Sequence, residues 1–358
     1  MTSPDTAPLT GQEIASAAYV LPPLQPQGLS LGIVAVSILL AIITLLVACL
    51  RIWVRLGLLT GLTRVWKTED YLFVLALVPF IPSVVWAIIA VHYGVGLRDA
   101  DLPSSLYAVR AGEYIVYWEV MYFVSSTLIK SAIGFTCIRI DQRKRVTYPV
   151  LLNIFIMWLT AALALMFVFV NCRPLAATWN PALGTCQQMI SLETVSYIVS
   201  AVQALTDWVS AFVPCYIVSK LQMPRRTKIT IVFILGLGIL ASIATIIRLP
   251  YLKYYNTAKY PKDFLFHVGV IVMCSNAECS LGIIACSLPP LRKLLKMFYE
   301  HWSSYKRGAQ DYDVRNSGMI LGPLHPQSDG LSSTRAAARN EIWHTLDNDD
   351  SSRKGILQ

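Results

Sequence analysis

The chain has 358 residues, of which 55% are hydrophobic and only 14% are charged, and its mean hydropathy is +0.54. A soluble domain usually carries about a quarter charged residues, so the composition excludes an ordinary soluble protein and predicts an integral membrane protein. The net charge of +9 does not indicate nucleic-acid binding, because the cations lie in short clusters at the ends of apolar runs, where they orient membrane proteins.

Residues 1–28 contain Pro, Ser and Gln without a helical period, and we expect them to form a flexible extracellular or lumenal tail. No Lys or Arg precedes Arg51, whereas a cleaved signal peptide needs a positively charged start. The first apolar run is therefore expected to be an uncleaved membrane anchor.

Seven apolar runs follow, each close to the ~20 residues that a helix needs to cross the hydrocarbon core of a bilayer. They cover residues 29–50, 71–93, 114–138, 148–170, 197–219, 229–249 and 267–288. We expect an all-α membrane protein whose seven-helix transmembrane domain spans residues 29–290.

The cations of the connecting segments are unevenly distributed. The connections after the first, third and fifth runs, together with the segment after the last run, form one set. This set carries more than twice as many Lys and Arg residues as the N-terminal tail and the other three connections. Because cations accumulate on the cytoplasmic side, we expect the N-terminus outside and the C-terminus in the cytosol. The membrane would be the plasma membrane or an endomembrane.

Two of the eight cysteines, Cys172 and Cys186, share one loop on the predicted outer side. That side is oxidising, so we expect a disulfide between them, which chain-entropy estimates value at about 3 kcal/mol. The bridge would hold Trp179 and Pro181 as a cap over the outer mouth. The alternative is a pair of free thiols.

The segment after Pro289-Pro290 has apolar residues at helical spacing and cations on other faces. This pattern predicts an amphipathic juxtamembrane helix over residues 291–305, lying on the anionic inner leaflet; a frayed extension is the alternative. Residues 306–358 are polar and lack a sustained apolar face, so we expect a disordered cytosolic tail.

Several charged and amide side chains fall inside the apolar runs. Charges at this depth are costly and usually face the interior of a helix bundle or a cavity. In the run 197–219, polar residues recur every three or four positions and form one stripe. The candidate site residues, from this run and three others, are Asp207, Glu278, Gln203, Asn276, Lys130, Glu119 and Arg248.

These residues have two interpretations. They could line a mid-membrane pocket, open to the outer side, with Asp207 and Glu278 as partners of a ligand or proton. They could instead only hold the helices together, with Lys130 pairing Glu278 and Arg248 pairing Glu119. Both interpretations stay open from the sequence.

Other kinds of site are excluded or unsupported. The last run has no lysine, so a retinal Schiff base cannot form there, and the five histidines are scattered. We predict no catalytic residues, no metal site and no cofactor.

A series of short motifs between about residues 30 and 300 has an order and spacing typical of one family. These motifs are Arg51, Glu69-Asp70-Tyr71, Tyr93-Gly94-Val95-Gly96, Arg139, Cys172-Arg173-Pro174, Trp179, Cys186, Thr206-Asp207, Pro214, Leu221-Gln222-Met223, Arg248, Glu278 and Leu288-Pro289-Pro290-Leu291. In them the chain resembles the fungal rhodopsin-domain integral membrane proteins, a receptor-like seven-helix family of filamentous fungi. Arg98 stands where the family often has a histidine, so no role of that histidine is carried over.

Some members of that family are thought to be pathogenicity-related receptors, and others are encoded in secondary-metabolite gene clusters, including the satratoxin-type cluster proteins. The resemblance implies a fungal source and a seven-helix fold. Our leading hypothesis for the function is a non-enzymatic protein that is receptor-like or accessory to such a pathway. Together with the polar stripe and the capped outer loop, it leads us to expect a small apolar ligand. A cytosolic signalling partner could bind at Arg225, Arg226 and the C-terminal tail.

Two other functions are possible on the same residues. A membrane-embedded terpene cyclase or isomerase could use Asp207 or Glu278 as a protonated acid in an apolar cavity. A transporter would also need intramembrane charges, but the two halves of the sequence show no repeat of the kind common in transporters.

Overall fold

The computed structural model describes residues 10–56, 66–186, 192–220, 225–255, 259–260 and 262–317. Residues 1–297 form one compact unit, and the described part of the second unit is the end of the last helix. The long helices are α2 (Leu29–Arg55), α3 (Thr68–His92), α4 (Leu106–Ile140), α5 (Lys144–Val170), α6 (Leu192–Lys220), α7 (Arg225–Arg248) and α8 (Phe264–Ser317). The short elements are α1 (Gly11–Tyr19), η1 (Asp99–Asp101), β1 (Cys172–Arg173), η2 (Leu175–Thr178), η3 (Pro181–Leu183), β2 (Thr185–Cys186) and η4 (Leu249–Tyr255).

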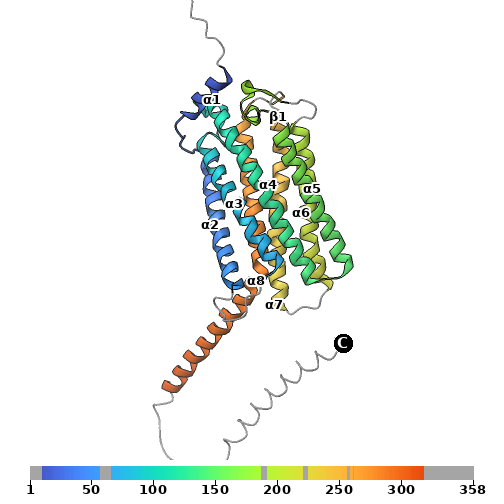
Figure 1. The fold of residues 1–358 in the computed structure, drawn as a ribbon. Coiled ribbons are helices and arrows are strands. Elements are labelled where there is room, and N and C mark those ends of the chain that lie inside the picture. The colour runs from blue at the N-terminus through green and yellow to red at the C-terminus, as the bar shows by residue number, and fades with distance from the viewer. Residues whose placement is uncertain are drawn as a thin grey trace, which may run out of the picture. The chain divides into compact units, whose positions relative to one another are not determined.

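The first unit is a bundle of long helices that lie side by side (Figure 1). Six described segments are long and apolar enough to cross a membrane: Leu29–Arg55, Thr68–His92, Leu106–Ile140, Lys144–Val170, Gly236–Tyr255 and Phe264–Leu291. The 29-residue helix α6 packs against both α5 and α7 and completes the bundle. The prediction of an all-α membrane bundle is confirmed.

Large apolar side chains cover the outside of this bundle. Leu39 on α2, Phe155 on α5 and Leu205 on α6 are 58%, 64% and 65% exposed. So much exposed apolar surface is typical of contact with lipid, not with water. The interior packs Phe73 and Phe80 of α3 against residues of α4 and α8.

The expectation that residues 1–28 lack a helix is wrong for α1. Thr10 and Glu13 form a reciprocal capping box at its start, which satisfies two otherwise free backbone amides. At its end, the Tyr19 hydroxyl donates to Glu113 at 2.9 Å, and the Arg110 guanidinium lies 4.0 Å from the Tyr19 ring centre. A short helix is marginal alone, so these contacts with α4 explain why α1 forms.

The loop between α5 and α6 is closed by the expected disulfide. Cys172 and Cys186 are bonded and lie opposite each other in the two-stranded ladder of β1 and β2. The Asn180 side chain inside the loop donates to the backbone carbonyl of Gly11 at 2.9 Å. The Trp179 ring meets the edge of Tyr117 on α4. The loop therefore holds α1 and α4 together at the predicted outer end.

At the same end, α8 and the turn that follows α3 approach each other closely through two glycines. Gly96 has φ +88°, a conformation that glycine adopts without steric cost. A Cβ at Gly269 would lie 2.8 Å from the Gly96 Cα, so there is no room for a side chain. The Gly96 amide donates to the Leu265 carbonyl at 2.9 Å.

Helix α8 does not end at Pro289-Pro290, where we expected a break before a separate helix over 291–305. It continues to Ser317, so residues 306–317, expected to be disordered, are helical. Proline at 290 has no amide to donate to the Cys286 carbonyl, and that carbonyl accepts instead from Arg51 on α2. A side-chain donor thus replaces a missing backbone bond. The remainder of the expected tail, residues 318–358, lies outside the described residues.

Candidate functional site

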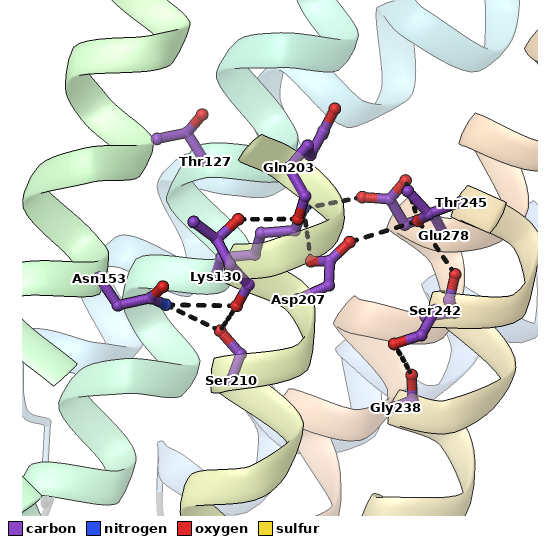
Figure 2. Close-up of polar contacts among 12 residues, drawn as sticks. Thr127, Lys130, Asn153, Gln203, Asp207, Ser210, Gly238, Ser242, Thr245 and Glu278 are labelled. Atoms are coloured by element: carbon purple, nitrogen blue, oxygen red, sulfur yellow. Dashed lines mark hydrogen bonds and ion pairs between the residues drawn. The ribbon is translucent and has the colours of Figure 1, made fainter. Parts of the chain in front are cut away.

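The centre of the site is one lysine shared by two carboxylates. Lys130 comes from α4, Asp207 from α6 and Glu278 from α8. The Lys130 Nζ lies 2.7 Å from Asp207 Oδ1 and 2.8 Å from Glu278 Oε1 (Figure 2). The exposed fractions of the three side chains are only 11%, 8% and 3%. The Lys130–Glu278 pair that we considered from the sequence is present, and Asp207 joins it.

A second layer surrounds this triad. Tyr122 on α4 donates its hydroxyl proton to Glu278 Oε2 at 3.0 Å. The Arg248 Nη1 donates to that Tyr122 oxygen, also at 3.0 Å, and its Nη2 donates to Gln203 Oε1 at 2.9 Å. We call Lys130, Asp207, Glu278, Tyr122 and Arg248 the central network. It links four helices, α4, α6, α7 and α8.

Two hydroxyls complete the hydrogen bonding of the central network. The Thr245 hydroxyl lies 3.3 Å from one oxygen of Asp207 and one of Glu278. The Ser275 hydroxyl accepts from Arg248 Nη1 at 3.1 Å. Buried charges that are paired and hydrogen-bonded in this way are tolerated, whereas isolated ones are strongly destabilising.

Asn276 belongs to a different contact. Its side-chain oxygen accepts from Trp118 Nε1 at 3.0 Å, and its amide nitrogen donates to the Ser37 hydroxyl at 3.3 Å. It therefore fastens α8 to α4 and α2 and does not take part in the central network.

The polar stripe of α6 divides between two neighbours. Ser210, at its inner part, accepts from the Asn153 amide of α5 at 3.1 Å (Figure 2). Ser200 and Gln203, further out, line a cavity. The stripe thus serves helix packing at one end and a cavity at the other.

This cavity has a volume of about 50 Å³ and lies between α4, α5, α6, α8, η4 and the end of α7. Its polar lining includes Glu119, Gln203, Arg248, Ser200 and Ser275. Its aromatic lining is Trp118, Tyr122, Phe123, Phe167 and Tyr255. A water occupies on the order of 10–15 Å³ by this measure, so the space holds a few waters or one small chemical group.

Glu119 lines this cavity together with Arg248. The pair between them that we considered from the sequence is not formed: the two terminal nitrogens of Arg248 bond to Tyr122, Gln203 and Ser275, and its Nε has no hydrogen-bond partner among the described residues. Within the described part of the chain, Glu119 has no hydrogen bond or ion pair. This carboxyl group is the member of the predicted set that the helix packing does not use.

The sequence analysis missed a second charged cluster at the predicted inner end. There Arg51 pairs with Asp70 at 2.9 Å, and Glu69 lies 3.4 Å from Arg55 and also contacts Arg139. We call these five residues the inner-end cluster. Arg51 is only 1% exposed. The adjacent acidic residues Glu69 and Asp70, directly before the run 71–93, were the sequence feature from which this cluster could have been expected.

Tyr122 and Thr245 were also missed. Both lie in apolar runs, where one hydroxyl group does not stand out from the many aromatic and β-branched residues. Only the packing of four helices shows that both hydroxyls lie beside Glu278.

Comparisons with known proteins agree with this architecture. The sequence profile of the fungal rhodopsin domain matches residues 50–297. A curated protein of Gibberella zeae, "Fugralins biosynthesis cluster protein 2", is 24% identical over 160 residues. The match covers 44% of this chain and 36% of that protein, so the chain spans well under half of its relative's length. No solved structure matches significantly.

Proposed function

This chain belongs to the fungal rhodopsin domain family, and from that premise we propose that it is a receptor-like, non-enzymatic membrane protein. It binds a small, largely apolar ligand in the cavity beside the central network, and the ligand enters from the outer side. The observation that carries the proposal is the cavity itself, which combines an aromatic wall with an unpaired Glu119. Ligand sites are usually apolar pockets with a few convergent polar groups.

The present cavity is smaller than most ligand sites, so binding would require side chains to move. A second cavity of about 20 Å³ lies next to the first and shares Phe123, Val199 and Gln203 with it. It reaches Lys130 and Thr206. Rotation of Phe123 and Gln203 would join the two spaces into one site that extends to the central network.

A ligand in the joined site would act on several helices at once. Gln203 contacts both Tyr122 and Arg248, and these in turn contact groups on α8. A ligand that displaced Gln203 would therefore change the contacts between α4, α6, α7 and α8. In this proposal the change reaches the cytosolic side, where a signalling partner binds near Arg225, Arg226 and the C-terminal tail.

The ion pairing of the central network does not favour the cyclase alternative. A general acid has to hold a proton, but Asp207 and Glu278 both lie within 2.8 Å of the Lys130 ammonium. A general acid also has to reach its substrate, and neither carboxylate lines either of the two cavities. Neither residue is therefore well placed to protonate a substrate.

One relative supports a proposal about the source of the ligand. The Gibberella zeae protein is named for a biosynthesis cluster. We propose that this chain likewise serves a secondary-metabolite pathway, as its receptor or accessory protein, and that its ligand is a metabolite of that pathway.

The test is to fill the cavity. Ser200 is 5% exposed and lines the cavity, so Ser200→Leu should occupy the space that the ligand needs. Full-length protein in lipid nanodiscs would be titrated with a panel of small aromatic compounds, and binding would be followed by thermal shift and calorimetry. We expect Ser200→Leu to weaken any binding by at least about tenfold.

The matched control is Leu205→Phe, which adds bulk on the lipid-facing side of the same helix. It should leave ligand affinity unchanged. If both variants bind every compound as the wild type does, the cavity is not the binding site and the central network serves packing alone.

A further inference from the structure

The interior charges of the outer half do not balance. The central network contains two cations, Lys130 and Arg248, and two carboxylates, Asp207 and Glu278. Glu119 lies in the wall of the adjoining cavity and adds a third carboxylate. In a membrane interior an ionised carboxylate without a partner is strongly unfavourable.

We propose that the ligand of this cavity is an organic monocation, an amine carried on an aromatic or apolar body, whose charged nitrogen binds Glu119. This inference rests on the proposed function and specifies its ligand class. One positive charge beside Glu119 would bring the three carboxylates and two cations to neutrality. A charge-assisted hydrogen bond would form between the ammonium and the carboxylate.

The cavity wall suits such a cation. Trp118 and Tyr122 are stacked with ring centres 5.5 Å apart, and both line the cavity with Phe123 and Tyr255. Aromatic faces attract ammonium groups through the negative potential of the ring, most strongly where water is excluded. The aromatic wall and the Glu119 carboxylate therefore both attract a positive charge.

Arg248 is the charge that opposes this arrangement. Its guanidinium also lines the cavity, but both of its terminal nitrogens bond to Tyr122, Ser275 and Gln203. These bonds hold its terminal nitrogens at the central network, next to the Tyr122–Glu278 hydrogen bond, whereas its Nε has no hydrogen-bond partner among the described residues. The ligand nitrogen is expected on the Glu119 side, away from Arg248.

The half-buried residues at the outer edge of the cavity indicate where the apolar part of the ligand would lie. The half-buried lining residues Phe167 and Val168 of α5, and Val195 and Ser196 of α6, are close to the outer ends of their helices. The deeper lining residues Val199, Ser200 and Ser275 are buried. An amphiphilic amine would place its nitrogen at Glu119 and its ring between the outer ends of α5 and α6.

The test compares three probes of similar size and different charge: 2-phenylethylamine, 2-phenylethanol and 3-phenylpropanoic acid. Each would be titrated into full-length protein in nanodiscs of neutral lipid, with affinity measured by calorimetry and saturation-transfer NMR. We expect the wild type to bind the amine at least about tenfold more tightly than the alcohol, because hydrogen bonds to charged groups are the stronger ones. The acid should bind most weakly.

Glu119→Gln should remove this preference. Amine affinity should fall by about tenfold or more while alcohol affinity stays the same. The matched control is Asp101→Asn, which removes an exposed carboxylate on the predicted outer side and should change neither affinity. In the absence of ligand, Glu119→Gln should also raise the thermal midpoint, because it removes an unpaired charge.

The outcomes separate this inference from the proposed function. Saturable binding of the alcohol with no preference for the amine, lost in Ser200→Leu, would overturn the charge assignment and leave the cavity as a ligand site. A lower thermal midpoint in Glu119→Gln would show that the Glu119 carboxylate makes a stabilising interaction within the protein. That result would also overturn the assignment. If no probe binds the wild type, both proposals fail.

Discussion

The central network and the inner-end cluster are both buried groups of ion pairs, but they differ in how their excess charge can be satisfied. The inner-end cluster has three arginines and two carboxylates, and its Arg139 side chain is 39% exposed. The excess cation is therefore hydrated. In the outer half, Glu119 is the excess charge; it is half-buried and lines a cavity to which five aromatic residues contribute.

The difference distinguishes a cluster that only holds helices together from one that adjoins a candidate binding site. The inner-end cluster joins α2 to α3, α4 and α8 through Arg51, Arg139 and the Cys286 carbonyl, and neither of the two cavities reaches it. The central network also joins helices, but it lies beside a cavity and beside Glu119, which has no hydrogen-bond partner among the described residues. A buried ion pair alone is thus poor evidence for a binding site, and the adjoining cavity is what distinguishes the two regions.

The largest expected effect comes from removing the shared cation. Lys130→Met would leave Asp207 and Glu278 facing each other without a counter-charge, and breaking a buried pair in this way costs about 3–5 kcal/mol. We expect the free energy of unfolding in an SDS titration to fall by this amount. Lys144→Met, at an exposed site on α5, is the control and should stay within about 0.5 kcal/mol of wild type.

The comparison sharpens if the carboxylates are neutralised as well. The triple variant Lys130→Met, Asp207→Asn, Glu278→Gln has no unpaired charge and should recover most of the lost stability. If the triple variant is as unstable as Lys130→Met, then hydrogen-bond geometry and not charge holds the central network together.

A smaller effect is expected at the inner end. Arg51→Met removes a partner of Asp70 and the donor to the Cys286 carbonyl, but Arg55 Nε still lies 3.2 Å from Asp70. We therefore expect a loss of about 2–3 kcal/mol by the same titration. Arg143→Met is the control, since that side chain is 70% exposed and lies 3.8 Å from Asp141. A loss at Arg51 as large as that at Lys130 would contradict the ranking.

The smallest effect is expected where solvent screens the charge. Glu13 is fully exposed, and hydrogen bonds from Thr10 lower its pKa below the usual value of 4.5. The carboxylate therefore stabilises α1 above pH 4.5, and that contribution is lost as the pH falls through the lowered pKa. Amide hydrogen exchange in α1, corrected for intrinsic rates, should show weaker protection at pH 3 than at pH 6.

Glu13→Gln provides the control for this titration, because its side chain has no proton to gain. In that variant, protection of α1 should not depend on the ionisation of residue 13. An equal loss of protection at pH 3 in both proteins would show that another group is responsible.

The all-α membrane bundle could be predicted from the sequence, because an apolar run of membrane-spanning length has few alternative structures. The disulfide was predictable for a similar reason, since Cys172 and Cys186 share one outer loop. These features depend on sequence position along one helix or loop.

The features that could not be predicted depend on several helices at once. Helix α1 forms because Tyr19 contacts Arg110 and Glu113, nearly a hundred positions further along the chain. Helix α8 continues past two prolines because Arg51 supplies a missing hydrogen bond. Among the described residues Glu119 has no hydrogen-bond partner, and the terminal nitrogens of Arg248 bond to neutral groups instead. No pattern within one helix carries that information.

The contact between Gly96 and Gly269 has a consequence for the depth of charges in the membrane. A Cβ at Gly269 would lie only 2.8 Å from the Gly96 Cα, so α8 packs directly on the backbone of the turn that follows α3. This close approach allows the Gly96 amide to donate to the Leu265 carbonyl, and the hydrogen bond ties α8 to the turn at one level. Glu278 lies nine positions after Gly269, roughly 13.5 Å further along the helix axis. The glycine contact thus helps to set the level at which Glu278 meets Lys130.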